Sequence, residues 1–379
     1  MHQTEQVLLN AIKKALFGIE TRFSADTDWQ DVLKEAKTQT VVGLVAEGAP
    51  AEIHTLWKKE EASTIAAYTR ILYAQKELSA LLDRSNIRFA VLKGMAAAVY
   101  YPNPSARTFG DIDFIVPKEQ FDYTLSVLRR NSFVEKKDHD SQRHVCFMKD
   151  CVTFELHRYF SSENAELEQH IISGLQRVER RSVNTVEISM LPTLENGMVL
   201  LEHIKGHLKS GMGLRQVIDW MMYVRAELDD AFWESVFKKE AEKADLLVLA
   251  KTATKMCQRH LGLDSSVTWC IDADESLCDE LMDYLLSSGN FGRKYGHDNQ
   301  VMTVATDIQR IGLFRKLQKS GMVNWRAYRK HRWLKPFCWI YQIFRYLKQW
   351  FRSRKNIDLF KDRRLAAQRA AMLERLEIH

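Results

Sequence analysis

The sequence predicts an α+β protein in which a small β-rich centre is flanked on both sides by helices. Residues 1–83 carry apolar residues at helical spacing, and the part 52–82 continues the pattern without a proline. From Ile87 the pattern changes to short runs rich in β-branched and aromatic residues, and helical patterns return after about residue 193. We divide the chain into an N-terminal helical region 1–83, an α/β core 84–192, a helical domain 193–310 and a basic amphipathic helical tail 311–379.

Four short runs predict the strands of the core. The first, 87–92, is followed by an alanine-rich helical turn at 94–100, and the second, 111–116, ends at Pro117. Proline is tolerated in the first turn of a helix, so a helix is expected from Pro117 to Arg130. The runs 143–149 and 151–159 lie close enough in the sequence to form a hairpin.

Two helices are expected at the start of the helical domain. The segment 193–196 has the composition of a helix cap and first turn, and this helix is expected to reach about Ser210. Gly211 and Gly213 separate it from a second helix at 214–228.

The composition is that of an ordinary globular protein. Its 379 residues are 46% hydrophobic and 27% charged, enough for two or three domains with their own cores. The N-terminus lacks the apolar core of a signal peptide, and no run of about 18 apolar residues occurs, so we expect a cytoplasmic protein. The six cysteines form no Cys-x-x-Cys pair, which predicts reduced thiols and no zinc site among them.

The most informative motif is a pair of carboxylates inside the second predicted strand. Asp111 and Asp113 are two positions apart, so on a strand they point to the same face and can hold one divalent cation. Two adjacent negative charges on a buried strand repel each other and lose hydration, so they require a cation, an arginine partner or strong hydrogen bonds. A strand that enters solvent with both acids hydrated is the alternative.

Three further features suggest a nucleotide site around this pair. Lys93 and Gly94 end the first strand and start a helix, where free backbone N–H groups can bind phosphate. Arg107 precedes the acids and can neutralise phosphate oxygens. Glu155 lies in the middle of an apolar strand. Each feature also has a simple structural explanation, as a turn glycine, a surface ion pair and an outward-facing strand residue.

The order of these motifs resembles the DNA polymerase β-like nucleotidyltransferase superfamily. More narrowly, the chain is similar to a bacterial family of uncharacterised nucleotidyltransferases in Leu92-Lys93-Gly94, Tyr101-Pro102, Arg107, Gly110-Asp111-Ile112-Asp113 and Glu155-Leu156-His157. The helical part adds Leu201-Glu202-His203, His207 and Leu214-Arg215-Gln216-Val217-Ile218-Asp219, so the resemblance covers about residues 85–225. It implies a polymerase β-like core, a small mixed sheet with helices. One departure is Gly94-Met95, where the superfamily usually has Gly-Ser or Gly-Gly.

The resemblance implies metal-assisted transfer of a nucleoside monophosphate from an NTP to a hydroxyl acceptor, with release of pyrophosphate. Asp111, Asp113 and Glu155 would hold Mg²⁺ or Mn²⁺, and Glu155 would help to deprotonate the acceptor. The residues implied to contact the nucleotide are Lys93, Gly94, Met95, Arg107, His203 and Arg215. Members of the family often lie near polysaccharide genes, which favours a sugar or another metabolite as acceptor, with RNA or protein as alternatives.

Several residues of this region have open alternatives. His203 and His207 are one helical turn apart, a spacing that can hold zinc, but no third ligand is evident and nucleotide contact is favoured. Arg215 and Asp219 have the same spacing and would form either a surface ion pair or, through Arg215, a phosphate contact. His157 either lines the acceptor side or is a hydrogen-bonded structural histidine.

The tail differs from the rest of the chain in its charge. Residues 311–379 hold 18 Lys and Arg against 4 Asp and Glu, a net charge of +14, which leaves −8 for residues 1–310. After Pro336 an apolar stripe repeats at helical spacing and basic residues lie on another face, as Phe337, Ile340, Phe344, Leu347 and Phe351 against Arg345, Lys348 and Arg352. This helix would lie on an anionic membrane surface, bind nucleic acid, or dock onto the body with its basic face in solvent.

Two other functions compete with nucleotidyl transfer. Metal-dependent glycosyltransferases also use Asp-x-Asp to hold a nucleotide sugar, but that function gives no role to Lys93 or Glu155. The non-enzymatic alternative is a transferase fold that binds nucleotide or RNA without chemistry. The three intact acids oppose it, and Met95 after Gly94 supports it.

Overall fold

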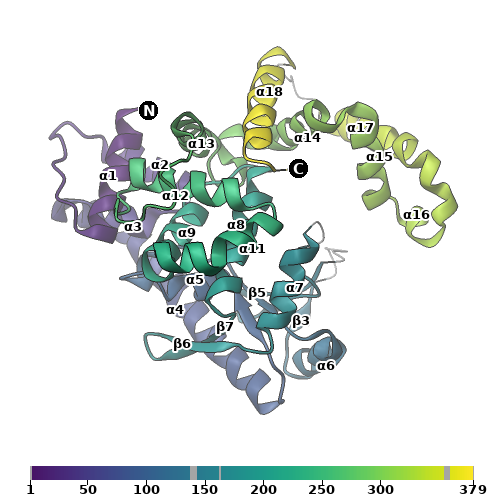
Figure 1. Ribbon diagram of the computed structural model, residues 1–379, viewed down its shortest axis with the longest axis horizontal. Helices are drawn as coiled ribbons and strands as arrows, with labels where there is room; N and C mark the ends of the chain where they lie inside the picture. Colours follow the sequence, from purple (N-terminus) through teal and green to yellow (C-terminus); the bar gives the residue numbers. More distant parts are fainter. Residues whose placement is uncertain (1, 137–142, 162–163, 354–358, 379) are drawn as a thin grey trace.

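The computed structural model describes residues 2–136, 143–161, 164–353 and 359–378. A mixed β-sheet lies in the body of the molecule with helices around it (Figure 1). Within the described residues its strands are β1 (Ala90–Leu92), β2 (Asp111–Ile115), β3 (Val134–Glu135), β4 (His144–Lys149), β5 (Val152–His157), β6 (Glu179–Val183) and β7 (Val186–Met190). They pair in the order β3-β4-β5-β2-β1-β7-β6. The predicted α+β fold with a small mixed sheet is confirmed.

The strand pairings bring three segments of the chain together at one point. β1 runs antiparallel to β2, and β2 runs parallel to β5. In this register Asp113 lies opposite Leu92 on one side and opposite Glu155 on the other. β5 also pairs with β4 as an antiparallel hairpin, which confirms the hairpin predicted at 143–149 and 151–159.

The N-terminal region is helical, as predicted. It consists of α1 (Gln3–Phe17), α2 (Trp29–Gln39), α3 (Val42–Gly48) and α4 (Ala51–Arg84). The long helix α4 contacts β2, β5 and β7, and Trp57 and Leu78 are among its fully buried side chains. This region therefore supports the strands that carry the acids.

The helices that follow the sheet begin close to their predicted positions, as α8 (Thr193–Leu208) and α9 (Leu214–Glu227). α9 contacts α8 and the short helix α5 (Gly94–Ala98), and most of its side chains are buried. The remaining helices of the body are α6 (Phe121–Arg130), α7 (Ala165–Gly174), α10 (Asp230–Phe232), α11 (Lys238–Lys243), α12 (Leu247–Leu261) and α13 (Glu275–Ser288). One hydrophobic cluster extends from α1 to α13 across the boundaries at 83/84 and 192/193, so the division into domains stays a prediction.

The C-terminal helices include an arm that projects from the body (Figure 1). They are α14 (Asn299–Ile311), α15 (Leu313–Asn324), α16 (Arg326–Lys330), α17 (Cys338–Ser353) and α18 (Leu359–Arg375). α15 and α17 pack against each other, whereas α18 returns to α13 and α14. Among the described residues, none of the helices is both long and apolar enough to cross a lipid bilayer.

Local structure departs from the prediction in several places. The helix expected from Pro117 starts as a 3-10 turn at Lys118–Gln120, and the α-helix α6 begins only at Phe121. β1 begins at Ala90 rather than at Ile87, because the backbone N–H of Arg88 donates to Gln120 Oε1 (2.9 Å) instead of to a strand. The helix α8 begins at Thr193, with Pro192 at the cap position and no side-chain cap. The hairpin of β6 and β7 was not predicted, because charged residues interrupt the apolar pattern of β6.

Candidate active site

The carboxylates of Asp111, Asp113 and Glu155 converge on one face of the sheet. Asp111 and Asp113 come from β2, and Glu155 of β5 lies directly opposite Asp113. One carboxylate oxygen from each of the three residues lies within 4.8 Å of those from the other two. Ligands about 2.1–2.5 Å from a shared divalent cation have separations of this order. The structure therefore brings together the three residues that the sequence proposed as metal ligands, and the set fits a divalent cation.

Asp113 is the buried member of the set, and two side chains bind it. Its side chain is 4% exposed, and Lys93 Nζ lies 2.9 Å from its Oδ1. His157 Nε2 lies 2.8 Å from the same oxygen. Burial acts to raise the pKa of Asp113, but the charge on Lys93 and the hydrogen bond from His157 outweigh it and hold the pKa below its usual range. Asp113 is therefore a carboxylate at neutral pH.

The pKa values of the other two acids, Asp111 and Glu155, shift upward. Desolvation and the charge on Asp113 raise the pKa of Asp111. Burial and the charges on Asp113 and Asp111 raise the pKa of Glu155 to about 7. The site thus holds more negative charge than Lys93 offsets, and a divalent cation would neutralise the excess.

Two histidines extend the set of possible ligands. His144 Nε2 lies 3.7 Å from Glu155 Oε1, and His157 Nε2 lies 3.8 Å from Glu155 Oε2. Burial, with the neighbouring His157, lowers the pKa of His144 to about 4, and burial also lowers the pKa of His157. Both imidazoles are neutral at pH 7, the form that binds metals. Sequence reasoning missed His144, although the predicted hairpin pairs it with His157.

The turn between β1 and α5 brings backbone N–H groups next to the acids. Lys93 has a φ of 54° and Gly94 a φ of 37°, so a side chain at Gly94 would be strained. An added Cβ at Gly94 would lie 3.7 Å from the backbone oxygen of Asp111. Met95 is buried, so its side chain packs in the core and is not available to a ligand.

The helices α8 and α9 place Arg215 and two histidines beside this turn. The rings of His203 and His207 are 4.5 Å apart, edge to face. Burial and the charges on Lys93 and Arg215 lower the pKa of His207 to about 3, and burial with His207 lowers the pKa of His203 well below its usual value. Arg215 Nη1 donates to the backbone oxygen of Thr108 (3.3 Å), and its Nε has no partner among the described residues. Arg215 therefore retains hydrogen-bonding capacity for an anion.

Arg107, by contrast, is bound inside the protein. Its Nε and Nη2 donate to the two carboxylate oxygens of Asp219, each at 2.7 Å. Tyr101 Oη also donates to Asp219 Oδ1 at 2.7 Å. The side chains of Arg107 and Asp219 are 4% and 1% exposed. The structure thus corrects two expectations: Arg107 has a buried carboxylate partner in place of a phosphate, and Asp219 forms no surface pair with Arg215.

Comparison with known proteins shows which family the chain belongs to. The family model described as "Uncharacterised nucleotidyltransferase" matches residues 25–262, more than half of the sequence. The chain belongs to this family. The match includes the sheet, the acids, α8 and α9. A crystal structure of an antigenic nucleotidyltransferase-like protein from Paracoccidioides brasiliensis is similar at 16% identity, over 52% of this chain and 95% of that one, with a TM-score of 0.35. The search of curated proteins found no match.

Two overlapping groups could hold a metal in this protein. Among the described residues, the groups with three or more metal-ligating side chains are Asp111, Asp113 and Glu155, and His144, Glu155 and His157. The helical pair His203 and His207 belongs to neither group. All six cysteines are free, as predicted. Of the two groups, the carboxylate group consists of the residues predicted from the sequence as metal ligands.

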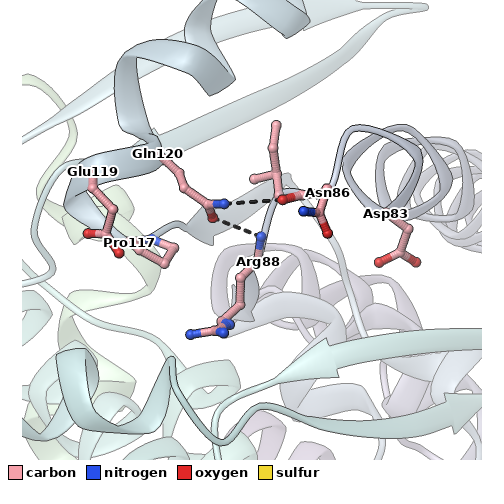
Figure 2. Close-up of a pocket in the computed structure, with 7 residues that line it drawn as sticks. Asp83, Asn86, Arg88, Pro117, Glu119 and Gln120 are labelled. Atoms are coloured by element: carbon pink, nitrogen blue, oxygen red, sulfur yellow. Dashed lines mark hydrogen bonds between the residues drawn. The ribbon is translucent and has the colours of Figure 1, made fainter.

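A cavity of about 360 Å³ lies elsewhere in the protein, between the end of α4 and the start of α6 (Figure 2). Arg88 and Pro117 line it, and both lie at the ends of β1 and β2 that are remote from Lys93 and Asp111. Gln120 crosses it by donating to the backbone oxygen of Asn86 (3.1 Å). Because it contains none of the three acids, this cavity is distinct from the candidate active site.

We expect the Asp219→Asn substitution to destabilise the protein by about 3–5 kcal/mol, because it leaves the Arg107 guanidinium buried without a counter-charge. Urea unfolding followed by circular dichroism measures this loss. Glu135→Gln is the matched control, because Glu135 pairs with Arg129 on the surface, where the pair contributes about 0–1 kcal/mol. A loss no larger for Asp219→Asn than for Glu135→Gln would contradict the structural role of Arg107.

A second prediction concerns the metal. We expect Mn²⁺ to stabilise the wild-type protein against unfolding, by about 2.7 kcal/mol at a concentration about 100 times the Kd. Asp113→Asn and Glu155→Gln should each abolish most of this gain, because each removes a ligand charge. Thermal unfolding with and without Mn²⁺ measures the gain, and Glu187→Gln on β7, whose side chain is 65% exposed, is the control. An undiminished gain in Asp113→Asn would exclude the carboxylate centre.

Proposed function

We propose that the protein is a Mg²⁺-dependent nucleotidyltransferase that moves a nucleoside monophosphate from an NTP to a hydroxyl acceptor. In this reaction the acceptor oxygen bonds to the α-phosphorus, the bond from that phosphorus to the bridging oxygen breaks, and pyrophosphate leaves. The observation that carries the proposal is the convergence of Asp111, Asp113 and Glu155 across β2 and β5. Membership of the nucleotidyltransferase family supports it.

The three acids differ in the parts that we assign to them. Asp113 is buried and ionised, and Lys93 and His157 fix its orientation, so it would hold the metal rather than exchange protons. Asp111 lies at the exposed start of β2, so a nucleotide could approach it from solvent. Mg²⁺ at these ligands, or Mn²⁺ in its place, would neutralise the phosphate oxygens and the leaving pyrophosphate.

Glu155 is the proposed general base. Burial and its acidic neighbours raise its pKa to about 7 when no cation offsets their charge, and a bound divalent cation would lower that pKa. The role rests instead on its place beside Asp113, where an acceptor hydroxyl could reach both the carboxylate and the metal. Glu155 is partly exposed, at 22%, so an acceptor hydroxyl can approach it.

The triphosphate would be bound by Lys93, Arg215 and the first turn of α5. Lys93 and Arg215 carry positive charge at the acids, and the backbone N–H groups of Gly94 and Met95 begin the helix. His203 is neutral and lies close enough to Lys93 and Arg215 for their charges to lower its pKa further. It is therefore suited to a hydrogen bond with the nucleoside rather than to a charge contact with phosphate.

The acceptor is the least constrained part of the proposal. A sugar or another small metabolite of envelope polysaccharide synthesis is favoured by the family resemblance, and RNA or protein are alternatives. A glycosyltransferase reaction has less support, because it leaves Lys93 and Glu155 without a role. The binding-only alternative is opposed by the three acids, which the fold holds together with raised pKa values at two of them.

The catalytic assignment predicts loss of transfer in Asp111→Asn and Asp113→Asn. Each change should lower the rate of pyrophosphate release from a panel of NTPs by about 1,000-fold, because metal stabilisation of the transition state contributes several kcal/mol. The panel is incubated with Mg²⁺ and a cell lysate as the source of acceptor, and the labelled product is identified by mass. Glu187→Gln serves as the control. Wild-type turnover in either aspartate variant would contradict the assignment of Asp111 and Asp113 as metal ligands needed for transfer.

The phosphate assignment makes a separate prediction for Arg215. Arg215→Gln should raise the KM for NTP about 10- to 100-fold, since a charge-assisted hydrogen bond contributes about 1.5–3 kcal/mol. Arg225→Gln on the same helix is the control, because Arg225 Nη1 donates to the backbone oxygen of Leu16, away from the acids. Steady-state kinetics on both variants measure KM. An unchanged KM in Arg215→Gln would show that the triphosphate is bound elsewhere.

A further inference from the structure

The helical arm has an extreme charge and aromatic composition. Residues 311–353 contain eleven Lys and Arg and not one Asp or Glu. The same segment contains four tryptophans and four phenylalanines. Exposed cations occur on each of its helices and on the connection before α17, as Arg315, Lys319, Lys330, Lys335 and Lys348. The arm is therefore a positively charged surface with aromatic side chains distributed among the charges.

The apolar stripe of α17 faces away from its packing partner. Cys338 and Gln342, one turn apart, are buried where α17 packs on α15. Phe337, just before α17, and Phe344 and Leu347 on it lie on a different face and are 48%, 67% and 46% exposed. Ile340 is partly buried, and the predicted stripe residue Phe351 and basic residue Arg352 lie outside the side chains that the structure describes. The expected alternative, in which this stripe docks onto the body, is therefore not what the structure shows. In Figure 1 the α15–α17 hairpin extends away from the sheet-containing body.

Other large apolar side chains on the arm are exposed as well. Trp333, on the connection between α16 and α17, is 71% exposed. Leu313 and Phe314 at the start of α15 are 56% and 60% exposed. Such residues cost free energy in water, so their concentration on one projecting element points to a partner that covers them.

We propose that this arm binds the surface of an anionic lipid bilayer, with the α17 stripe in the headgroup region and the cations on lipid phosphates. A helix with an apolar stripe, basic flanks and interfacial aromatic residues has the composition of an interfacial helix. Each Lys or Arg close to an anionic leaflet contributes about 1 kcal/mol, so the arm carries ample charge for binding. The proposal goes beyond nucleotidyl transfer and does not depend on it.

Two other partners fit the observations less well. A nucleic acid would use the cations, but it offers no apolar environment to Phe344 and Leu347. A second copy of the chain, docked stripe to stripe, would bring two segments of like charge together with no acidic residue between them. Both partners remain as measurable outcomes of the experiment.

Vesicle flotation of the full chain tests the proposal. We use vesicles of phosphatidylcholine alone and of phosphatidylcholine with about 30 mol% phosphatidylglycerol, at about 0.15 M salt. The wild type should float with the anionic vesicles only. Phe344→Ser with Leu347→Ser should weaken binding about tenfold or more, since two apolar side chains leave the membrane interface. Lys335→Glu with Lys348→Glu should weaken it at least as much.

The matched control is Leu56→Ser with Ile65→Ser, which removes two apolar side chains of similar exposure, 50% and 54%, from α4. It should bind like the wild type. Circular dichroism checks that every variant is folded. Equal flotation with neutral vesicles, or unchanged binding in the Phe344 and Leu347 variant, would overturn the proposal. So would binding of a single-stranded oligonucleotide in place of vesicles, or a dimer that this variant dissociates. None of these readouts uses NTP, so the result is independent of the catalytic assignment.

Discussion

The mutual repulsion of Asp111, Asp113 and Glu155 is the constraint around which the site is organised. Parallel pairing of β2 and β5 sets Glu155 opposite Asp113, and a one-residue shift of either strand would send its acids to the other face. Lys93 and His157 both bind the buried Asp113 and leave Asp111 and Glu155 with raised pKa values. Lys93 offsets the negative charge of one acid, and among the described residues the charges of the other two have no such partner. Two remaining negative charges are better neutralised by a divalent cation than by a single further lysine.

The two arginines near the acids have different roles, because Arg107 is paired with a buried carboxylate. Arg107 is neutralised by Asp219, so it adds little net charge, and it ties the loop before β2 to α9. Arg107 and Arg215 both donate to the backbone oxygen of Thr108, three residues before Asp111. The buried pair thus fixes α9 against the strand, and through α9 it positions Arg215. A buried ion pair adds little stability compared with apolar residues, which supports a positioning role.

Short-range patterns predicted the acids and their strands, because alternation along a strand specifies which side chains share a face. They also predicted the helical flanks and the α17 stripe. The pairing of Arg107 with Asp219 could not be predicted from the sequence, because the two residues are 112 positions apart. Arg215, one helical turn from Asp219, was an equally plausible partner. His144 was missed because a histidine at the start of a strand carries no signal until its register with His157 is known. Whether other helices cover the apolar stripe of α17 depends on tertiary packing, which a local sequence pattern does not predict.

The chemistry and the proposed membrane contact lie in separate parts of the chain. The family match ends at residue 262, and the uniformly basic segment begins after residue 310. Residues 1–310 carry a net charge of −8, so an anionic bilayer would repel the body while it attracts the arm. The body would then stand off from the membrane while the arm stays bound to it, so the proposed membrane contact would leave the acids accessible from water.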